Sequence, residues 1–139
     1  HYGLNSIDPI RDELGNVNIC LIKEGSRKDA GGRTVHNVRL FHELLAGAAV
    51  VISEGATTAA EATFLGRPTI YVNTQRPGYI QKLVEHGVLH LASDSRSAAS
   101  MAKGFMESGA PVSKDLKALK NECRDIAGET AKLITGLCN

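Results

Sequence analysis

Short apolar runs alternate with amphipathic runs along this chain, and this alternation constrains its fold more than any other feature. Four apolar runs have the length and composition of strands: 17–22, 49–53, 69–73 and 88–91. Two of them, 49–53 and 69–73, are almost continuously apolar, as strands buried on both faces of a parallel sheet are. The alternation predicts an α/β domain, with a three-layer Rossmann-like parallel sheet and helices on both faces.

Helical signals fill the gaps between the apolar runs. Pro, Gly and polar cap residues mark helices over 8–14, 37–47, 57–65, 77–85 and 95–107, the first with Asp8 as its N-cap. A long last helix is expected over 113–137, because apolar residues recur there at helical spacing (Leu116, Leu119, Cys123, Ile126, Leu133 and Ile134). This stripe is expected to cover its own domain, and an exposed stripe that meets another domain is the alternative.

Length and charge exclude several classes of protein. The 139 residues predict a single domain over 1–139, and a start at His1 instead of Met suggests a processed, tagged or excised chain. The 16 Lys and Arg against 15 Asp and Glu give a net charge of +1, which argues against a protein that binds nucleic acid through bulk charge. No apolar run approaches the roughly 18 residues that a membrane span needs.

The cysteines indicate neither a disulfide framework nor a metal site. Cys20, Cys123 and Cys138 are odd in number and scattered, and no Cys-x-x-Cys spacing occurs. Cys20 lies in a strand-like apolar run, where a buried thiol behaves as a small hydrophobe. We therefore expect reduced structural cysteines, no bound metal and a cytoplasmic location.

The turn after the run 49–53 carries the clearest chemical signal. Ligands of open α/β sheets bind beyond the carboxyl ends of the strands. Here small residues connect a strand to a helix, whose unpaired first amides and dipole can hold a phosphate or diphosphate. Two threonine hydroxyls can add donors, and a glutamate further along the helix suits two adjacent sugar hydroxyls. The candidate residues are Ser53, Glu54, Gly55, Ala56, Thr57, Thr58 and Glu61.

A purely structural interpretation of the same turn stays open. Thr57 can be an N-cap only, and Glu61 a solvated acid that favours the helix dipole. The two commonest nucleotide fingerprints, the P-loop and Gly-x-Gly-x-x-Gly, are absent. The glycine-rich, charged loop over 23–35 is either a surface loop or a loop near the site. For His42 and His86, surface or capping roles are expected.

One stretch also resembles a known family. It reads Leu-Leu-Ala-Gly-Ala-Ala-Val-Val-Ile-Ser-Glu-Gly-Ala-Thr-Thr over 44–58, then Glu-Ala at 61–62 and Leu-Gly-Arg-Pro at 65–68. Together with its surroundings over 37–87 it resembles the C-terminal domain of GT-B fold enzymes. Two relatives fit best: an uncharacterised prokaryotic family of glycosyltransferase-like proteins and the non-hydrolysing UDP-N-acetylglucosamine 2-epimerases.

The resemblance implies roles for individual residues. The backbone at Gly55, Ala56 and Thr57 would contact the diphosphate of a nucleotide sugar, and Glu61 would take the ribose hydroxyls. The wall around the base would begin at Val35, His36 and Asn37. Arg76 would lie near the sugar, and His1 would match a histidine of the epimerases. Two departures, Ala56 for a second glycine and Ala60 for a first glutamate, weaken the likeness to the epimerases more than that to the transferases.

The implied function is that of a nucleotide-sugar-binding domain, the C-terminal half of a glycosyltransferase or a sugar epimerase. A UDP-sugar-like donor would be its substrate, without a cofactor or metal, and the missing N-terminal domain of the same chain would be its partner. The isolated domain is expected to be inactive. The alternative is a stand-alone module that binds a nucleotide, another anion or a protein without catalysis.

Overall fold

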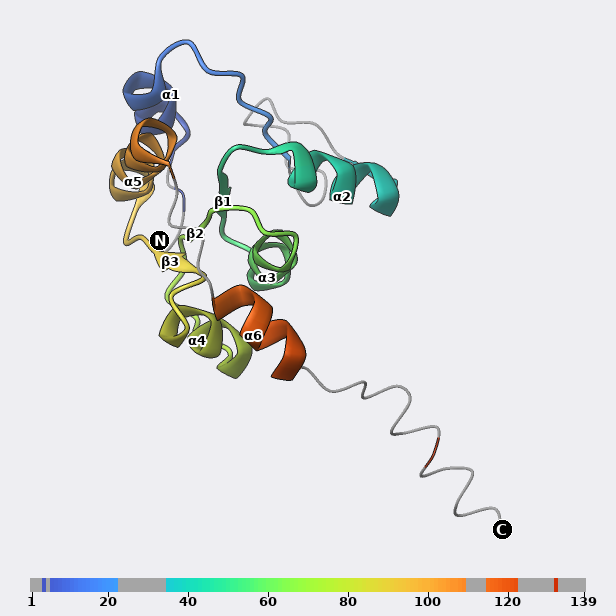
Figure 1. Cartoon of the computed structure of the whole chain (residues 1–139). Coiled ribbons are helices and arrows are strands. Elements are labelled where there is room, and N and C mark those ends of the chain that lie inside the picture. Colours follow the sequence, from blue (N-terminus) through green and yellow to red (C-terminus); the bar gives the residue numbers. More distant parts are fainter. Residues whose placement is uncertain (1–3, 5, 23–34, 110–114, 123–131, 133–139) are drawn as a thin grey trace.

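The structure, a computed structural model, describes residues 4, 6–22, 35–109, 115–122 and 132 (Figure 1). In chain order its elements are α1 (Asp8–Leu14), α2 (Val38–Gly47), β1 (Val51–Ser53), α3 (Ala56–Phe64), β2 (Thr69–Tyr71), α4 (Gly78–Glu85), β3 (His90–Leu91), α5 (Ser95–Ser108) and α6 (Asp115–Glu122). No helix among these residues is long and apolar enough to cross a membrane.

The three strands form a parallel sheet in the order β1-β2-β3. Ser53 of β1 lies opposite Tyr71 of β2, which in turn lies opposite Leu91 of β3. The strands therefore end level with one another, and the connections into α3, α4 and α5 all leave the sheet at one edge. This arrangement confirms the predicted α/β class and parallel sheet, with strands shorter than the apolar runs.

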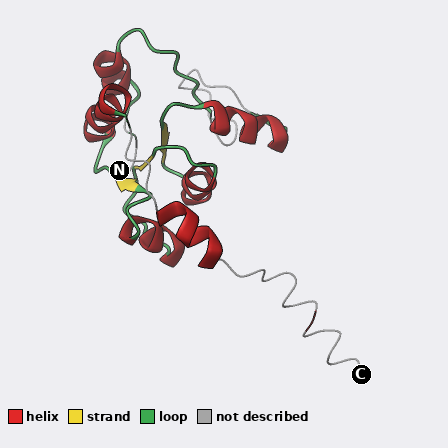
Figure 2. Ribbon diagram, viewed as in Figure 1, coloured by secondary structure: helices red, strands yellow, loops and turns green. Residues whose placement is uncertain are grey.

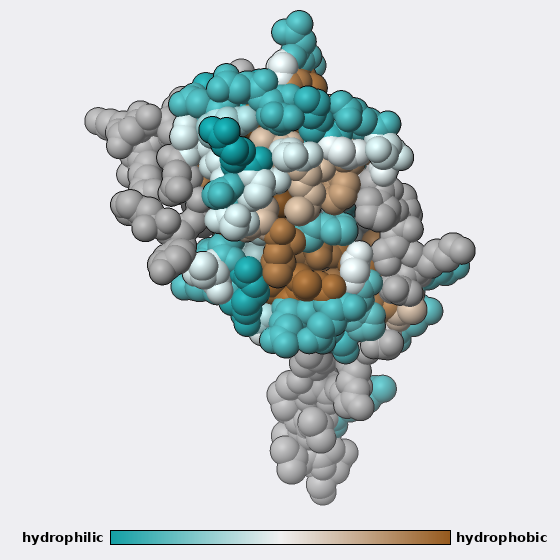
Figure 3. Space-filling view, turned by 90° about the vertical axis from the view of Figure 1, so that its left-hand side faces the viewer, coloured by the Kyte–Doolittle hydropathy of each residue, from teal (hydrophilic) through white to brown (hydrophobic). Residues whose placement is uncertain are grey.

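The two side-chain faces of β2 contact different helices. Ile70, with no exposed surface, lies in a buried cluster with Ala98 and Ala102 of α5. Tyr71 points the other way, into a cluster that contains Ala59, Ile80, Leu83, Val88, Leu89 and Leu119. Figures 1 and 2 show the same division, with α1 and α5 side by side on one side of the strands and α3 on the other. On the side that carries α1 and α5, apolar residues gather in the middle, between polar residues above and below (Figure 3).

The strand expected over 17–22 is wrong. Only Ile22 forms an isolated β-bridge, and the Val17 amide donates instead to the Gly15 carbonyl at 2.9 Å. Ile19 is 37% exposed and Cys20 is exposed, so the expectation of a buried Cys20 thiol is wrong as well. The physical reason is pairing, because an apolar run becomes a strand only where a neighbour takes its backbone hydrogen bonds. Among the described residues, the sheet consists of β1, β2 and β3, and β1 pairs with β2.

Most helices begin and end within one or two residues of their predicted bounds. The bounds of α1 agree with the prediction, but its cap does not: Asp8 is the first residue of the helix, and the N-cap is Ile7. The Asp8 amide donates to the Ser6 Oγ at 3.0 Å, so the hydroxyl of Ser6 satisfies this early amide. Gly15 follows α1 at φ 62°, a conformation that favours glycine.

The last helix is confirmed only where the structure describes it. α6 lies within the predicted range 113–137, and its Leu119, 3% exposed, packs into the cluster around Tyr71. Leu116 is half-buried against the same cluster. This part of the stripe therefore covers its own domain, as expected. Cys123, Ile126, Leu133, Ile134, Cys138 and the loop over 23–34 lie outside the described residues.

Candidate functional site

The turn between β1 and α3 leaves the first amides of the helix without a capping side chain. Ser53, 7% exposed, donates from its Oγ to the Gly55 carbonyl at 3.0 Å and accepts the Gly55 amide at 3.1 Å. Gly55 then takes the N-cap position in an extended conformation, and α3 has no side-chain cap. Thr57 is thus not the N-cap, and the helix begins at Ala56. A helix start of this kind presents free N–H groups and positive potential to an anion.

Three polar residues share one face of α3. Thr57 is exposed, while Thr58 and Glu61 are half-buried. Residues three and four positions apart are neighbours on a helix surface, so both hydroxyls lie on the side of the Glu61 carboxylate. This face therefore combines hydroxyl donors near the helix start with a carboxylate acceptor about one turn further along.

Glu61 has a partner that the sequence did not indicate. The Nε2 atom of His42, on α2, lies 3.4 Å from the Glu61 Oε2 atom. The two side chains are 44% and 37% exposed, so both remain accessible from solvent. The exposure of His42 agrees with its predicted surface role. Its contact with Glu61 also places it next to the candidate site.

A second loop, at the end of β2, is hydrogen-bonded to the first. The Nδ2 atom of Asn73 donates to the Glu54 carbonyl at 3.0 Å, and its Oδ1 accepts the Gln75 amide at 3.1 Å. The Glu54 carboxylate, in turn, accepts the amide of Leu4. Asn73 thus fixes the turn after β1 against the loop that carries Arg76.

Arg76 stays close to this edge of the sheet because its guanidinium is held by its own loop. It donates to the carbonyls of Asn73 and Gln75, the latter at 3.2 Å, and lies 5.7 Å from the centre of the Tyr71 ring. Burial raises the pKa of Tyr71, and the opposing influence of the Arg76 charge is smaller. Tyr71 therefore remains a neutral packing residue beneath an exposed cation.

The start of α5 differs from the start of α3. Asp94 caps α5: its carboxylate accepts the Ser97 amide at 2.7 Å, while the Ser97 hydroxyl accepts the Asp94 amide at 3.1 Å. The hydrogen bond from the Ser97 amide lowers the pKa of Asp94. This helix start already holds a negative charge, so of the two only α3 offers its first amides to an added anion.

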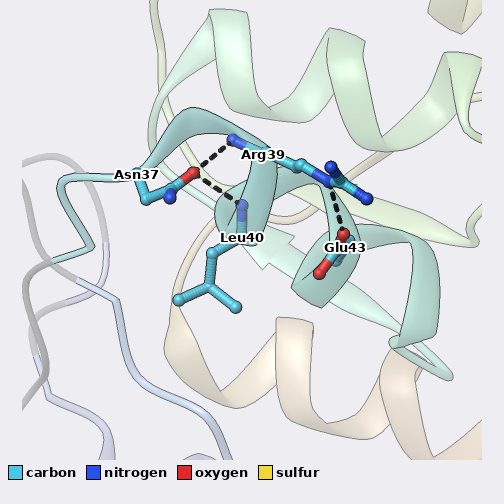
Figure 4. A network of polar contacts seen from close by, with 4 residues as sticks. All are labelled: Asn37, Arg39, Leu40 and Glu43. Carbon is cyan, nitrogen blue, oxygen red and sulfur yellow. Dashed lines mark hydrogen bonds and ion pairs between the residues drawn. The ribbon is translucent and has the colours of Figure 1, made fainter.

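The residues of the predicted base wall lie at the start of α2. Asn37 is the N-cap of α2, where its Oδ1 accepts the Arg39 amide at 2.9 Å and the Leu40 amide at 3.2 Å (Figure 4). His36 is exposed beside it. In the described part of the chain, no hydrogen bond or ion pair links His36 or Asn37 to residues 53–61.

Sequence reasoning missed two residues of this region, His42 and Asn73. Asn73 had a usable signal, because it is the polar last residue of the apolar run 69–73, at the edge where ligands bind. His42 had none, because its approach to Glu61 depends on how α2 packs against α3. His1 lies outside the described residues, and among those described no three His, Cys, Asp or Glu residues form a group that could hold a metal ion.

Comparison of the chain with protein-family models, with curated proteins and with solved structures gives no match.

Proposed function

We propose that this chain is a nucleotide-binding domain that takes a UDP-sugar-like ligand at the start of α3. The observation that carries the proposal is the uncapped helix start directly after β1, with Gly55 as N-cap and Glu61 on the same helix. In this proposal the domain is a three-layer Rossmann-like sheet of the kind found in the C-terminal half of GT-B proteins. The diphosphate binds the turn at 55–57 through the amides of Ala56 and Thr57, because the Gly55 amide already donates to the Ser53 Oγ. The ribose hydroxyls bind the Glu61 carboxylate.

The chemistry of such a domain is orientation and charge stabilisation. Backbone amides that point at a leaving diphosphate stabilise its developing charge without any covalent step. Arg76 adds positive potential at the same edge, although part of its hydrogen-bonding capacity is used by its own loop. The parent enzyme is a glycosyltransferase or a sugar epimerase, whose N-terminal domain supplies the facing wall of the cleft.

A protein-interaction module is a second candidate function. It is favoured by the exposed apolar residues of α2, where Val38 is 66% and Leu40 is 47% exposed. These residues lie next to Asn37, on the helix that also carries His42. An interaction module without catalysis would use this face and leave the start of α3 without a ligand.

Gly55→Ala tests the proposed function without disturbing the fold. A Cβ at Gly55 meets only the Thr58 and Ser53 side chains at 3.7 Å or more, which is ordinary van der Waals contact. The added methyl group shields the first amides of α3 from a ligand. We expect UDP to shift amides of residues 55–61 in the wild type, and Gly55→Ala to weaken binding about tenfold, the worth of one charge-assisted hydrogen bond.

The matched control is Gly47→Ala. A Cβ at Gly47 meets nothing within 4 Å, and this glycine ends α2, so the variant should bind UDP like the wild type. The measurement is a nuclear magnetic resonance titration with UDP, UDP-N-acetylglucosamine and other nucleotides, with thermal unfolding to check each fold. Absence of any amide shift up to millimolar nucleotide contradicts the proposal, as does equal binding by both alanine variants.

A further inference from the structure

We infer that His42 is a positioning residue, which holds the Glu61 carboxylate in place for two adjacent hydroxyls of a ribose. The inference rests on the proposed function and deepens it, since it adds a second residue to the part of the site that recognises the sugar. It is carried by the contact between His42 Nε2 and Glu61 Oε2 at 3.4 Å.

The contact engages one side of the carboxylate. His42 faces Oε2, and in the described part of the chain Oε1 has no hydrogen-bond or ion-pair partner. The distance of 3.4 Å is longer than the usual N–H···O hydrogen bond, so the imidazole stands beside the carboxylate and leaves it accessible to a ligand. A glutamate side chain that turns freely loses rotamer freedom when it binds a diol. A neighbour that already restricts it reduces this loss, and affinity gained by such preorganisation appears only with a ligand that uses the carboxylate.

The backbone beneath His42 is fixed against α3. Leu45 of α2 and Ala62 of α3, 5% and 0% exposed, share a buried cluster with Val51 of β1, and Phe41 packs against it. Ala62 is the neighbour of Glu61 in sequence, and Phe41 is the neighbour of His42. The packed cluster therefore fixes the backbone positions from which the two polar side chains extend toward each other.

An exposed ion pair often contributes nothing measurable, so the experiment has to separate positioning from simple surface contact. UDP and 2′-deoxy-UDP differ only in one of the two adjacent ribose hydroxyls. The ratio of their dissociation constants reports how well Glu61 engages the pair of hydroxyls. A change in general stability, or in diphosphate binding, moves both constants together and leaves the ratio unchanged.

The test measures this ratio in the wild type, His42→Ala, His42→Gln and His86→Ala. We expect the wild type to prefer UDP about tenfold, the worth of a hydrogen bond to a charged group. His42→Ala should lose most of this preference with little effect on 2′-deoxy-UDP. His42→Gln should restore part of it, because its amide nitrogen can occupy the place of Nε2. His86 is the C-cap of α4, so His86→Ala is the control and should keep the wild-type ratio.

Each outcome decides between the two proposals. A wild-type preference that persists in His42→Ala overturns the role of His42 and leaves the proposed function standing. An equal loss for both nucleotides assigns His42 a structural role and also overturns the inference. A wild type that binds both nucleotides equally contradicts the role of Glu61, and one that binds neither contradicts the proposed function; the inference falls with either.

Discussion

At the scale of single residues, His90 makes the stability of the fold depend on pH. It lies in β3, half-buried, with its ring centre 4.8 Å from that of Phe105 on α5. Burial lowers the pKa of His90, so the folded state favours the neutral ring. The unfolded chain protonates His90 first, near pH ~6.5. The stability that the neutral ring contributes is therefore present above that pH, and it is lost as the pH falls toward and through the lower pKa of the folded state.

We expect His90→Gln to reduce the loss of thermal stability between pH 7.5 and pH 5. The glutamine cannot take up the proton that penalises the folded wild type, while the other groups titrate in both proteins and cancel in their difference. The measurement is the melting temperature of both proteins across this range. Parallel curves for the two proteins would contradict the assignment to His90.

The positions of several candidate site residues could be predicted from the sequence, because they follow directly from where a strand ends and the next helix begins. A buried strand is followed by the start of a helix, with Gly55 as its N-cap and Thr57 and Glu61 within it, and this order can be recognised in the sequence. Arg76 can be recognised in the same way, because it lies between a buried strand and the helix that follows it. The contact of His42 with Glu61 could not be recognised, because it depends on the packing of two helices that no local pattern encodes. Asn37 has a local role that its residue type also allows, since an asparagine can cap a helix as well as contact a ligand, and here it caps α2.

At the scale of elements, α5 shows how small residues set the distance between a helix and the sheet. Ala98 and Ala102, both at most 1% exposed, pack against Ile70 and Val72. We expect Ala98→Leu to lower the free energy of unfolding by about 1–3 kcal/mol, because the added volume has no space in this contact. Ser100→Leu adds a leucine to the exposed side of the same helix, and should stay within about 0.5 kcal/mol of the wild type.

Urea unfolding measures both α5 variants. The two proteins should have the same dependence on urea and different midpoints. If Ala98→Leu and Ser100→Leu have equal midpoints, the close packing of α5 on the sheet is contradicted. A leucine on either side leaves the helix itself intact, so the comparison isolates the contact with β2.

The helices and the strands β1 and β2 were predictable because each has a local signal: a cap, a glycine end or a continuous apolar run. The run 17–22 failed for the opposite reason, since its composition matches a strand and nothing local shows whether a neighbour pairs with it. The strand propensity of a residue mainly reflects how well its side chain fits a half-buried sheet. A prediction from propensity is therefore wrong where no sheet lies beside the segment. The shortness of β3, only His90–Leu91, follows from the same dependence on pairing.

At the scale of the whole molecule, β2 is the element that contributes to two of the three buried clusters of the described residues. Ile70 contributes to the cluster against α5, while Tyr71, its neighbour in sequence, contributes to the cluster with α3, α4 and α6. A strand of three residues cannot release one face without losing the backbone pairing that holds the other. The described part of the chain is therefore expected to unfold as one cooperative unit.

Hydrogen exchange of Ile70→Val tests this expectation directly. The variant removes one methyl group from the cluster against α5 and should cost about 0.5–1.5 kcal/mol. If the two faces unfold together, amides of α3 lose the same protection as amides of α5, although no atom of the α3 cluster has changed. A loss of protection confined to α5 would show instead that the faces open separately. The site at the start of α3 would then depend on only half of the packed structure.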